Sequence, residues 1–122
     1  MDINIPEVHA EVTDAFWRYD RALLENDIDT VIALFWDSPH TVRYSPVDLL
    51  YGIQEIKDFR QTQRGTPLKR EVTKLVVTTF GRDFGTANCE TRRTDTGALG
   101  RQSHSWVRLE DGWRIVAAQV SV

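Results

Sequence analysis

Residues 101–120 read RQSHSWVRLEDGWRIVAAQV, and this stretch decides the fold. Two runs rich in aromatic and β-branched residues, 101–109 and 113–120, flank Glu110-Asp-Gly112, which is a strong hairpin signal. Working back along the chain, residues 72–79 and 84–93 are also strand-like, and Gly81-Arg-Asp83 forms a turn between them. The C-terminal half therefore predicts a four-stranded antiparallel meander.

The N-terminal half predicts three helices. Apolar residues recur at three- and four-residue spacing over residues 6–25, as on one face of a long helix. Asp27 or Asp29 can cap a second helix over residues 30–36, and residues 53–63 form the third. Short strands are expected at 41–44 and near 49–51. Three helices followed by a meander indicate one α+β domain, residues 1–122, with the helices on one face of the sheet.

Composition narrows the function classes. The 122 residues are 41% hydrophobic and 27% charged, with a net charge of -3 and no basic stripe, which argues against nucleic acid as a partner. One cysteine, Cys89, excludes an internal disulfide and fits a reducing compartment. No signal peptide or apolar run of membrane length is present, so we expect a cytoplasmic protein that does not contact membranes.

The face of the sheet opposite the helices is expected to be covered by another protein surface. If the hairpin has a three-residue loop, one face carries four apolar residues, and such a face predicts a homodimer interface. His104 alternates with Trp106 and would join that interface. The four residues are Trp106, Val116, Ala118 and Val120.

The opposite face of the hairpin is a candidate cavity wall, because small residues there are flanked by polar ones. The alternative is that its polar residues lie at a solvated sheet edge. This face carries Trp113, Ile115, Ala117 and Gln119 on one strand and Arg101, Ser103, Ser105 and Val107 on the other.

Tyr19 and Arg43 stand out as candidate functional residues. Tyr19 falls on the buried stripe of the first helix, where its hydroxyl needs a partner, either in the core or on a ligand. Arg43 alternates with Val42 and Tyr44 and is either exposed or functional. An arginine opposite a buried tyrosine would favour a phenolate.

Metal and cofactor chemistry have no sequence support. The three histidines are isolated from one another, and no phosphate-binding glycine loop precedes a helix. We therefore expect no metal and no cofactor.

Several strings occur together in order: Leu34-Phe-Trp36, Thr41-Val-Arg-Tyr44, Leu50-Tyr-Gly52, Thr79-Phe-Gly-Arg-Asp-Phe84, Gly100-Arg-Gln-Ser103 and Gly112-Trp-Arg-Ile-Val-Ala-Ala118. Together they resemble the small NTF2-like (cystatin-like, SnoaL-like) family of the oxalurate and cyanuric-acid pathways, whose type member hydrolyses dicarboxyurea. The resemblance implies an α+β cone with three N-terminal helices packed on a curved antiparallel sheet. It also implies a homodimer, no metal, and an essential tyrosine–arginine pair, which here matches Tyr19 and Arg43.

The function so implied is a metal-independent hydrolase that releases ammonia from a small, anionic carboxylated urea. Arg43 would bind a carboxylate or the oxyanion, and Tyr19 would act as acid or base. The expected substrate-binding residues are Phe35, Tyr51, Arg101, Ser103 and Gln119, although the family commonly has histidine in place of Gln119.

Two other functions remain open. One is a non-catalytic subunit that binds a ligand or a pathway amidase. The other is an isomerase, which needs an acidic base in the cavity, and Asp48 is the candidate for that base.

Overall fold

The first helix carries the apolar stripe seen in the sequence. A computed structural model describes residues 1–122, and in it α1 spans Pro6–Glu25, as predicted. Proline suits the first turn of a helix because an N–H there has no partner within the helix. Val8, Val12 and Phe16 are fully buried at four-residue spacing. Asn26 then adopts the left-handed conformation and ends α1.

The second and third helices are short. Asp27 caps α2 (Ile28–Ala33) by accepting a hydrogen bond from the Thr30 N–H. This helix ends earlier than predicted because the segment after it pairs with the sheet: the Leu34 carbonyl accepts from the Ile115 N–H. The third helix, α3 (Gly52–Gln61), begins where Gly52 takes a positive φ of 82°.

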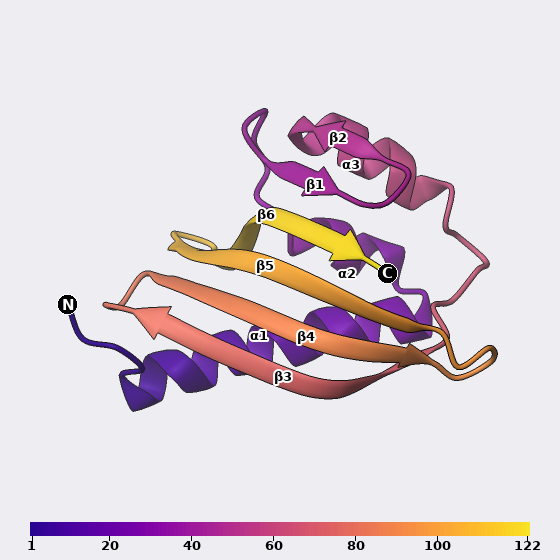
Figure 1. Cartoon of the computed structure of the whole chain (residues 1–122). Helices are drawn as coiled ribbons and strands as arrows, with labels where there is room; N and C mark the ends of the chain where they lie inside the picture. The colour runs from indigo at the N-terminus through magenta and orange to yellow at the C-terminus, as the bar shows by residue number, and fades with distance from the viewer.

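Six strands form a single sheet in the order β2-β1-β6-β5-β4-β3 (Figure 1). Strands β3 (Arg70–Phe80), β4 (Phe84–Arg93), β5 (Leu99–Leu109) and β6 (Gly112–Ser121) form the predicted antiparallel meander. β1 (Val42–Tyr44) pairs with β6 in parallel and with β2 (Leu49–Tyr51) antiparallel. The sequence predicted the short strands but not that they extend the meander.

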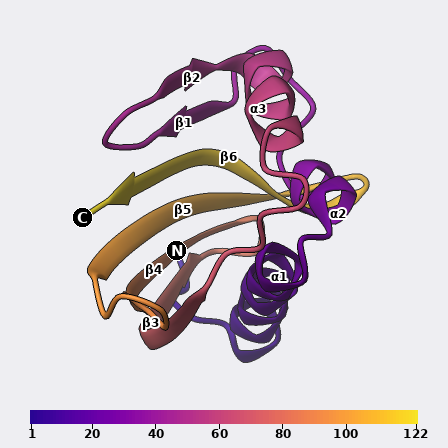
Figure 2. The same cartoon turned by 90° about the vertical axis from the view of Figure 1, so that its right-hand side faces the viewer.

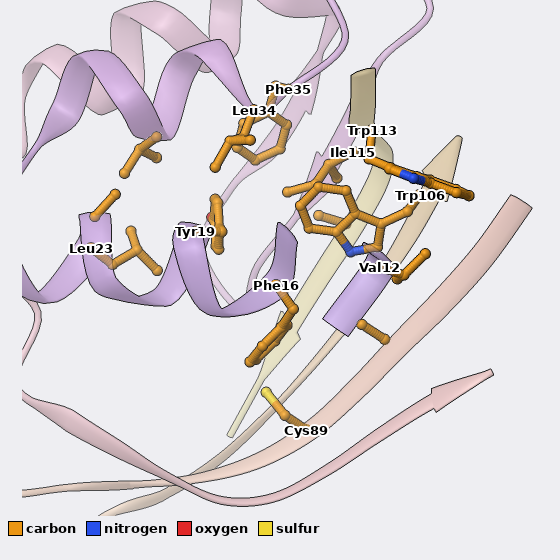
Figure 3. Close-up of a cluster of buried hydrophobic side chains, with 14 of the residues drawn as sticks. Val12, Phe16, Tyr19, Leu23, Leu34, Phe35, Cys89, Trp106, Trp113 and Ile115 are labelled. Atoms are coloured by element: carbon orange, nitrogen blue, oxygen red, sulfur yellow. The ribbon is translucent and has the colours of Figure 1, made fainter. Parts of the chain in front are cut away.

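The helices lie along one side of the curved sheet (Figure 2). The core fills the space between them: Phe16 of α1 points toward Cys89 of the sheet, and Tyr19 faces Leu34 and Phe35 of the segment after α2 (Figure 3). The expectation of an α+β fold with three helices on a curved sheet is confirmed. None of the helices has the length and apolar character needed to cross a membrane.

The facing of the last hairpin differs from the prediction for two reasons. Its loop has two residues rather than three, since Leu109 pairs with Gly112 and Trp106 therefore pairs with Ile115. The register then shifts by one residue at Val116, because the next pair is Ser105 with Ala117. A one-residue shift moves every later side chain to the opposite face.

Three of the four predicted interface residues consequently face the helices, and Val116, at the register shift, is half-buried. Trp106 and Ala118 are buried, and Val120 lines a cavity together with Tyr19 and Leu23 of α1. His104, expected at an interface, is also buried, with 2% of its surface exposed. The side of the sheet that faces away from the helices, called the outer face below, carries Ser103, Ser105, Ala117 and Gln119 instead.

Candidate functional site

A cavity of about 240 Å³ opens between α1, α3 and the strands β4, β5 and β6. Five arginines contribute to its wall, and no aspartate or glutamate does. The arginines are Arg43, Arg60, Arg70, Arg93 and Arg101. A wall with this charge favours an anionic ligand.

Two of these arginines are buried without a counter-ion. Arg43 and Arg60 are each 7% exposed, and neither belongs to any of the ion pairs in the protein. Both stack on one ring, with their guanidinium carbons 4.6 Å and 5.3 Å from the centre of Phe59. The Arg43 Nη1 and the Arg60 Nε have no hydrogen-bond partner. Buried unpaired charge is costly, so an anion that enters the cavity lined by these two residues would be held favourably by their charge.

Tyr19 lies beside this pair. The Arg60 Nη2 donates a hydrogen bond of 2.6 Å to the Tyr19 hydroxyl oxygen, and both groups are buried. Phe35 and His104 pack edge-on against the tyrosine ring, at centroid distances of 5.9 Å and 5.0 Å. Figure 3 shows Tyr19 projecting from α1 toward Phe35. The ring is therefore held on both sides, and Tyr19 forms part of the cavity wall.

A second buried network supports the cavity from the sheet side. Arg70 donates to Asp20 at 2.9 Å, and each of the two side chains is 8% exposed. The Arg70 Nη1 also donates to the side-chain Oε1 of Gln102 at 2.7 Å, and the Gln102 Nε2 contacts the His104 Nε2. Unlike Arg43 and Arg60, Arg70 has a carboxylate partner that compensates its charge, so its role is to stabilise the fold.

The electrostatics of the site follow from burial and from the crowding of cations. Burial, and then the neighbouring Arg60, lower the pKa of Arg43 from its usual value. Burial, with Arg70, Arg60 and Arg43 as further causes, lowers the pKa of His104 to about 3. His104 is therefore neutral at pH 7 and adds no charge to the cavity wall.

The neutral His104 predicts a pH dependence of stability. An unfolded histidine has a pKa near 6.5, so below that pH the unfolded chain takes up a proton that folded His104 refuses until about pH 3. The free energy of unfolding should therefore fall as the pH drops below about 6.5, with a slope approaching about 1.4 kcal/mol per pH unit. Urea unfolding between pH 7.5 and 5 measures this slope. His104→Gln should lose that part of the slope, and an equal slope in both proteins would contradict the prediction.

The structure brings some of the predicted site residues together. Tyr19 and Arg43 line the same cavity, and Arg101 lies at its exposed rim. Phe35 is buried behind Tyr19 and supports the ring rather than lining the cavity.

Three predicted substrate-binding residues do not line this cavity. Tyr51 is 53% exposed on the edge strand, where its hydroxyl lies 3.1 Å from that of Tyr44. Ser103 donates a hydrogen bond to Asn88, and Gln119 is exposed; both belong to the outer face. The one-residue shift at Val116 explains why Gln119 lies on the outer face rather than in the cavity.

Sequence reasoning also missed several residues of the cavity and of the buried network that supports it. Asp20 continues the four-residue series of Val12 and Phe16, so its burial was visible in the periodicity. Arg60 follows Ile56 at the same spacing on α3. Arg70 and Gln102 gave no such signal, because their contacts depend on how distant strands meet.

No group of three or more histidine, cysteine, aspartate or glutamate side chains is arranged to hold a metal ion. The polar residues that line the cavity carry guanidinium, phenol, amide and aliphatic hydroxyl groups, the last from Thr91 and Ser121. This set can bind an anion, donate hydrogen bonds to a carbonyl oxygen and exchange one proton through Tyr19.

The fold and the cavity define the class: an NTF2-like (cystatin-like) protein with a cationic pocket under its helices. The profile of the AtzH-like family matches residues 1–122, so the chain belongs to the AtzH-like family. No curated protein sequence matches it significantly.

Solved structures agree with this assignment. A protein of unknown function from Pectobacterium atrosepticum is 45% identical, with a TM-score of 0.93 over 98% of this chain and 94% of that one. A cystatin-like fold protein from Burkholderia xenovorans is 46% identical, with a TM-score of 0.91 over 99% and 95% of the two chains. An NTF2-like protein of unknown function from Pseudomonas putida, 18% identical, shares the fold with a TM-score of 0.81 over 94% and 86%.

Proposed function

We propose that the protein is a metal-independent hydrolase that releases ammonia from a small carboxylated urea, such as a dicarboxyurea-like or oxalurate-like compound. The observation that carries this proposal is the pair of buried arginines without counter-ions, Arg43 and Arg60, beside the Tyr19 hydroxyl in one cavity. A carboxylate would supply the missing negative charge, and a planar guanidinium can bind it through two parallel hydrogen bonds.

In this mechanism Arg43 acts on the oxygen atoms of the substrate. Arg43 lines the cavity and has no carboxylate partner, so its guanidinium can donate to a carboxylate or to the carbonyl that reacts. When water adds to that carbonyl, the carbon becomes tetrahedral and its oxygen gains negative charge. A fixed cation in a buried site stabilises this charge more in the transition state than in the ground state. Tyr19 provides the acid–base step.

The two other functions fit the site less well. An isomerase of this fold needs an acidic base in the cavity, and Asp48 is not among the cavity residues, while the buried Asp20 is bonded to Arg70. A non-catalytic binding subunit would need the same cationic cavity but would not need a tyrosine held by an arginine.

The expected assembly remains a prediction. We propose a cytoplasmic homodimer that pairs through the outer face, with a pathway amidase as a further partner. Because Trp106, Ala118 and Val120 face inward, that interface would use Ser105, Ala117 and Gln119.

The test is an ammonia-release assay with the purified protein. The panel contains carboxylated ureas, oxalurate and biuret derivatives, and each compound is also titrated for binding. Ammonia release from at least one compound is the expected result. Saturable binding of these anions without release from any of them would contradict the hydrolase and support the binding subunit.

A further inference from the structure

We infer that Arg60 is a positioning residue that holds the Tyr19 hydroxyl as a hydrogen-bond donor toward the cavity, so that Tyr19 enters the reaction as an acid. The inference rests on the proposed hydrolase function and assigns the direction in which the proton moves. It also gives a role to a buried arginine outside the Tyr19–Arg43 pair.

The direction of one hydrogen bond carries the argument. A guanidinium group has no acceptor, so Arg60 Nη2 must donate to the Tyr19 oxygen, 2.6 Å away. That bond occupies an acceptor site of the hydroxyl and leaves its single proton unused. The Tyr19 hydroxyl makes no other hydrogen bond within the protein, and Tyr19 lines the cavity. Its proton is therefore free for a group that binds there.

The surroundings of Arg60 distinguish it from a structural arginine. Arg70, which is structural, is bonded to the buried Asp20. Arg60 instead stacks against Phe59 and Phe35, with its guanidinium carbon 5.3 Å and 5.8 Å from the ring centres, and has no carboxylate partner. The two rings orient the guanidinium without neutralising it, so its full charge acts on Tyr19.

The hydrolysis with Tyr19 as the acid needs only water and the substrate. The oxygen of water bonds to the substrate carbonyl carbon, and the carbon–nitrogen bond breaks. Tyr19 gives its hydroxyl proton to the leaving nitrogen, and the phenolate that forms is stabilised by Arg60. The proton lost by the attacking water then passes to the Tyr19 phenolate, so the enzyme is regenerated without another reactant.

The first experiment does not depend on turnover. The chain has only three tyrosines, so tyrosine labelled with ¹³C at Cζ gives three resonances, and Tyr19→Phe identifies the one from Tyr19. Arg60→Met should move this resonance clearly and Arg60→Lys should move it less, because the ring carbon next to the oxygen senses the lost bond. Arg64→Met is the matched control: Arg64 lies four residues further on, is exposed and pairs with Asp29.

The second experiment is kinetic and uses the panel compound with the fastest ammonia release. Arg60→Met should lower kcat at least about tenfold, with KM changed less than about twofold, and Arg60→Lys should restore part of the loss. Combined with Tyr19→Phe, Arg60→Met should lower kcat no further, because Arg60 acts through Tyr19.

The outcomes separate the two proposals. An unmoved Tyr19 resonance, or losses that multiply in the double variant, would overturn the positioning role. Weaker binding of the substrate to Tyr19→Phe when Arg60→Met is added would also overturn it, since Arg60 would then hold the ligand itself. If Arg60→Met moves the Tyr19 resonance but the wild-type protein releases no ammonia, the hydrolase and the acid step are overturned, while the hydrogen bond stands.

Discussion

Replacing Arg43 by alanine is expected to lower ammonia release at least about a hundredfold, which corresponds to roughly 3 kcal/mol of transition-state stabilisation. Arg43 lines the cavity without a carboxylate partner, so its guanidinium supplies both donors and a charge to the developing oxyanion. Initial rates of ammonia release at saturating substrate measure the loss in kcat. Substrate binding should weaken as well, because the same group holds the carboxylate.

The folded state should tolerate this change. Arg43 has no carboxylate partner, and burial already disfavours its charged form. Its removal therefore relieves an uncompensated charge, at the cost of its stacking on Phe59. The free energy of unfolding is expected to stay the same or to rise. Arg82→Ala, on an exposed turn, is the control and should keep wild-type turnover. Wild-type turnover in Arg43→Ala would mean that Arg43 is structural and that the proposed mechanism is wrong.

The sequence predicts most of the fold because its signals are local. The bounds of α1 follow from an apolar stripe between Pro6 and Asn26, and β4 follows from a run of residues between two turns. These elements came out as predicted. The end of α2 did not, since Leu34 pairs with Ile115, a residue distant in the chain.

The site was only partly predictable. The face on which each β6 side chain lies depends on whether the number of residues between it and the preceding strand is odd or even. One residue fewer in the loop and one extra at Val116 decide which side chains enter the cavity. Neither change alters the hydrophobic alternation enough to be read from one sequence. The sequence therefore predicted Ser103 and Gln119 in the cavity, but both lie on the outer face. Their neighbours Gln102 and Val120 line the cavity instead.

The buried arginines illustrate a second limit. Periodicity places Arg60 on the inner face of α3, but it does not tell a paired arginine from an unpaired one. That distinction comes from the partner: Asp20 faces Arg70, and no carboxylate faces Arg43 or Arg60. Two kinds of buried arginine thus lie in one cavity wall, and they predict opposite results on substitution.

Asp20→Ala is accordingly expected to lower the free energy of unfolding by about 3–5 kcal/mol, because it leaves Arg70 charged, buried and unpaired. Such a loss is a large fraction of the stability of a small domain. Urea unfolding at pH 7 measures it, and Asp20→Asn, which keeps an acceptor for Arg70, should lose less. Asp29→Ala is the matched control, because Asp29 also pairs with an arginine, Arg64, but in an exposed pair that contributes little.

The double variant Asp20→Ala with Arg70→Met shows whether the loss comes from the uncompensated charge. Removing the arginine as well takes away the buried cation, so stability should recover in part, although Gln102 then loses its donor. A double variant that loses the sum of the two single losses would mean that the pair adds nothing beyond the packing of each side chain. Recovery would establish that this arginine stabilises the fold through its carboxylate, in contrast to Arg43 and Arg60, which have no carboxylate partner.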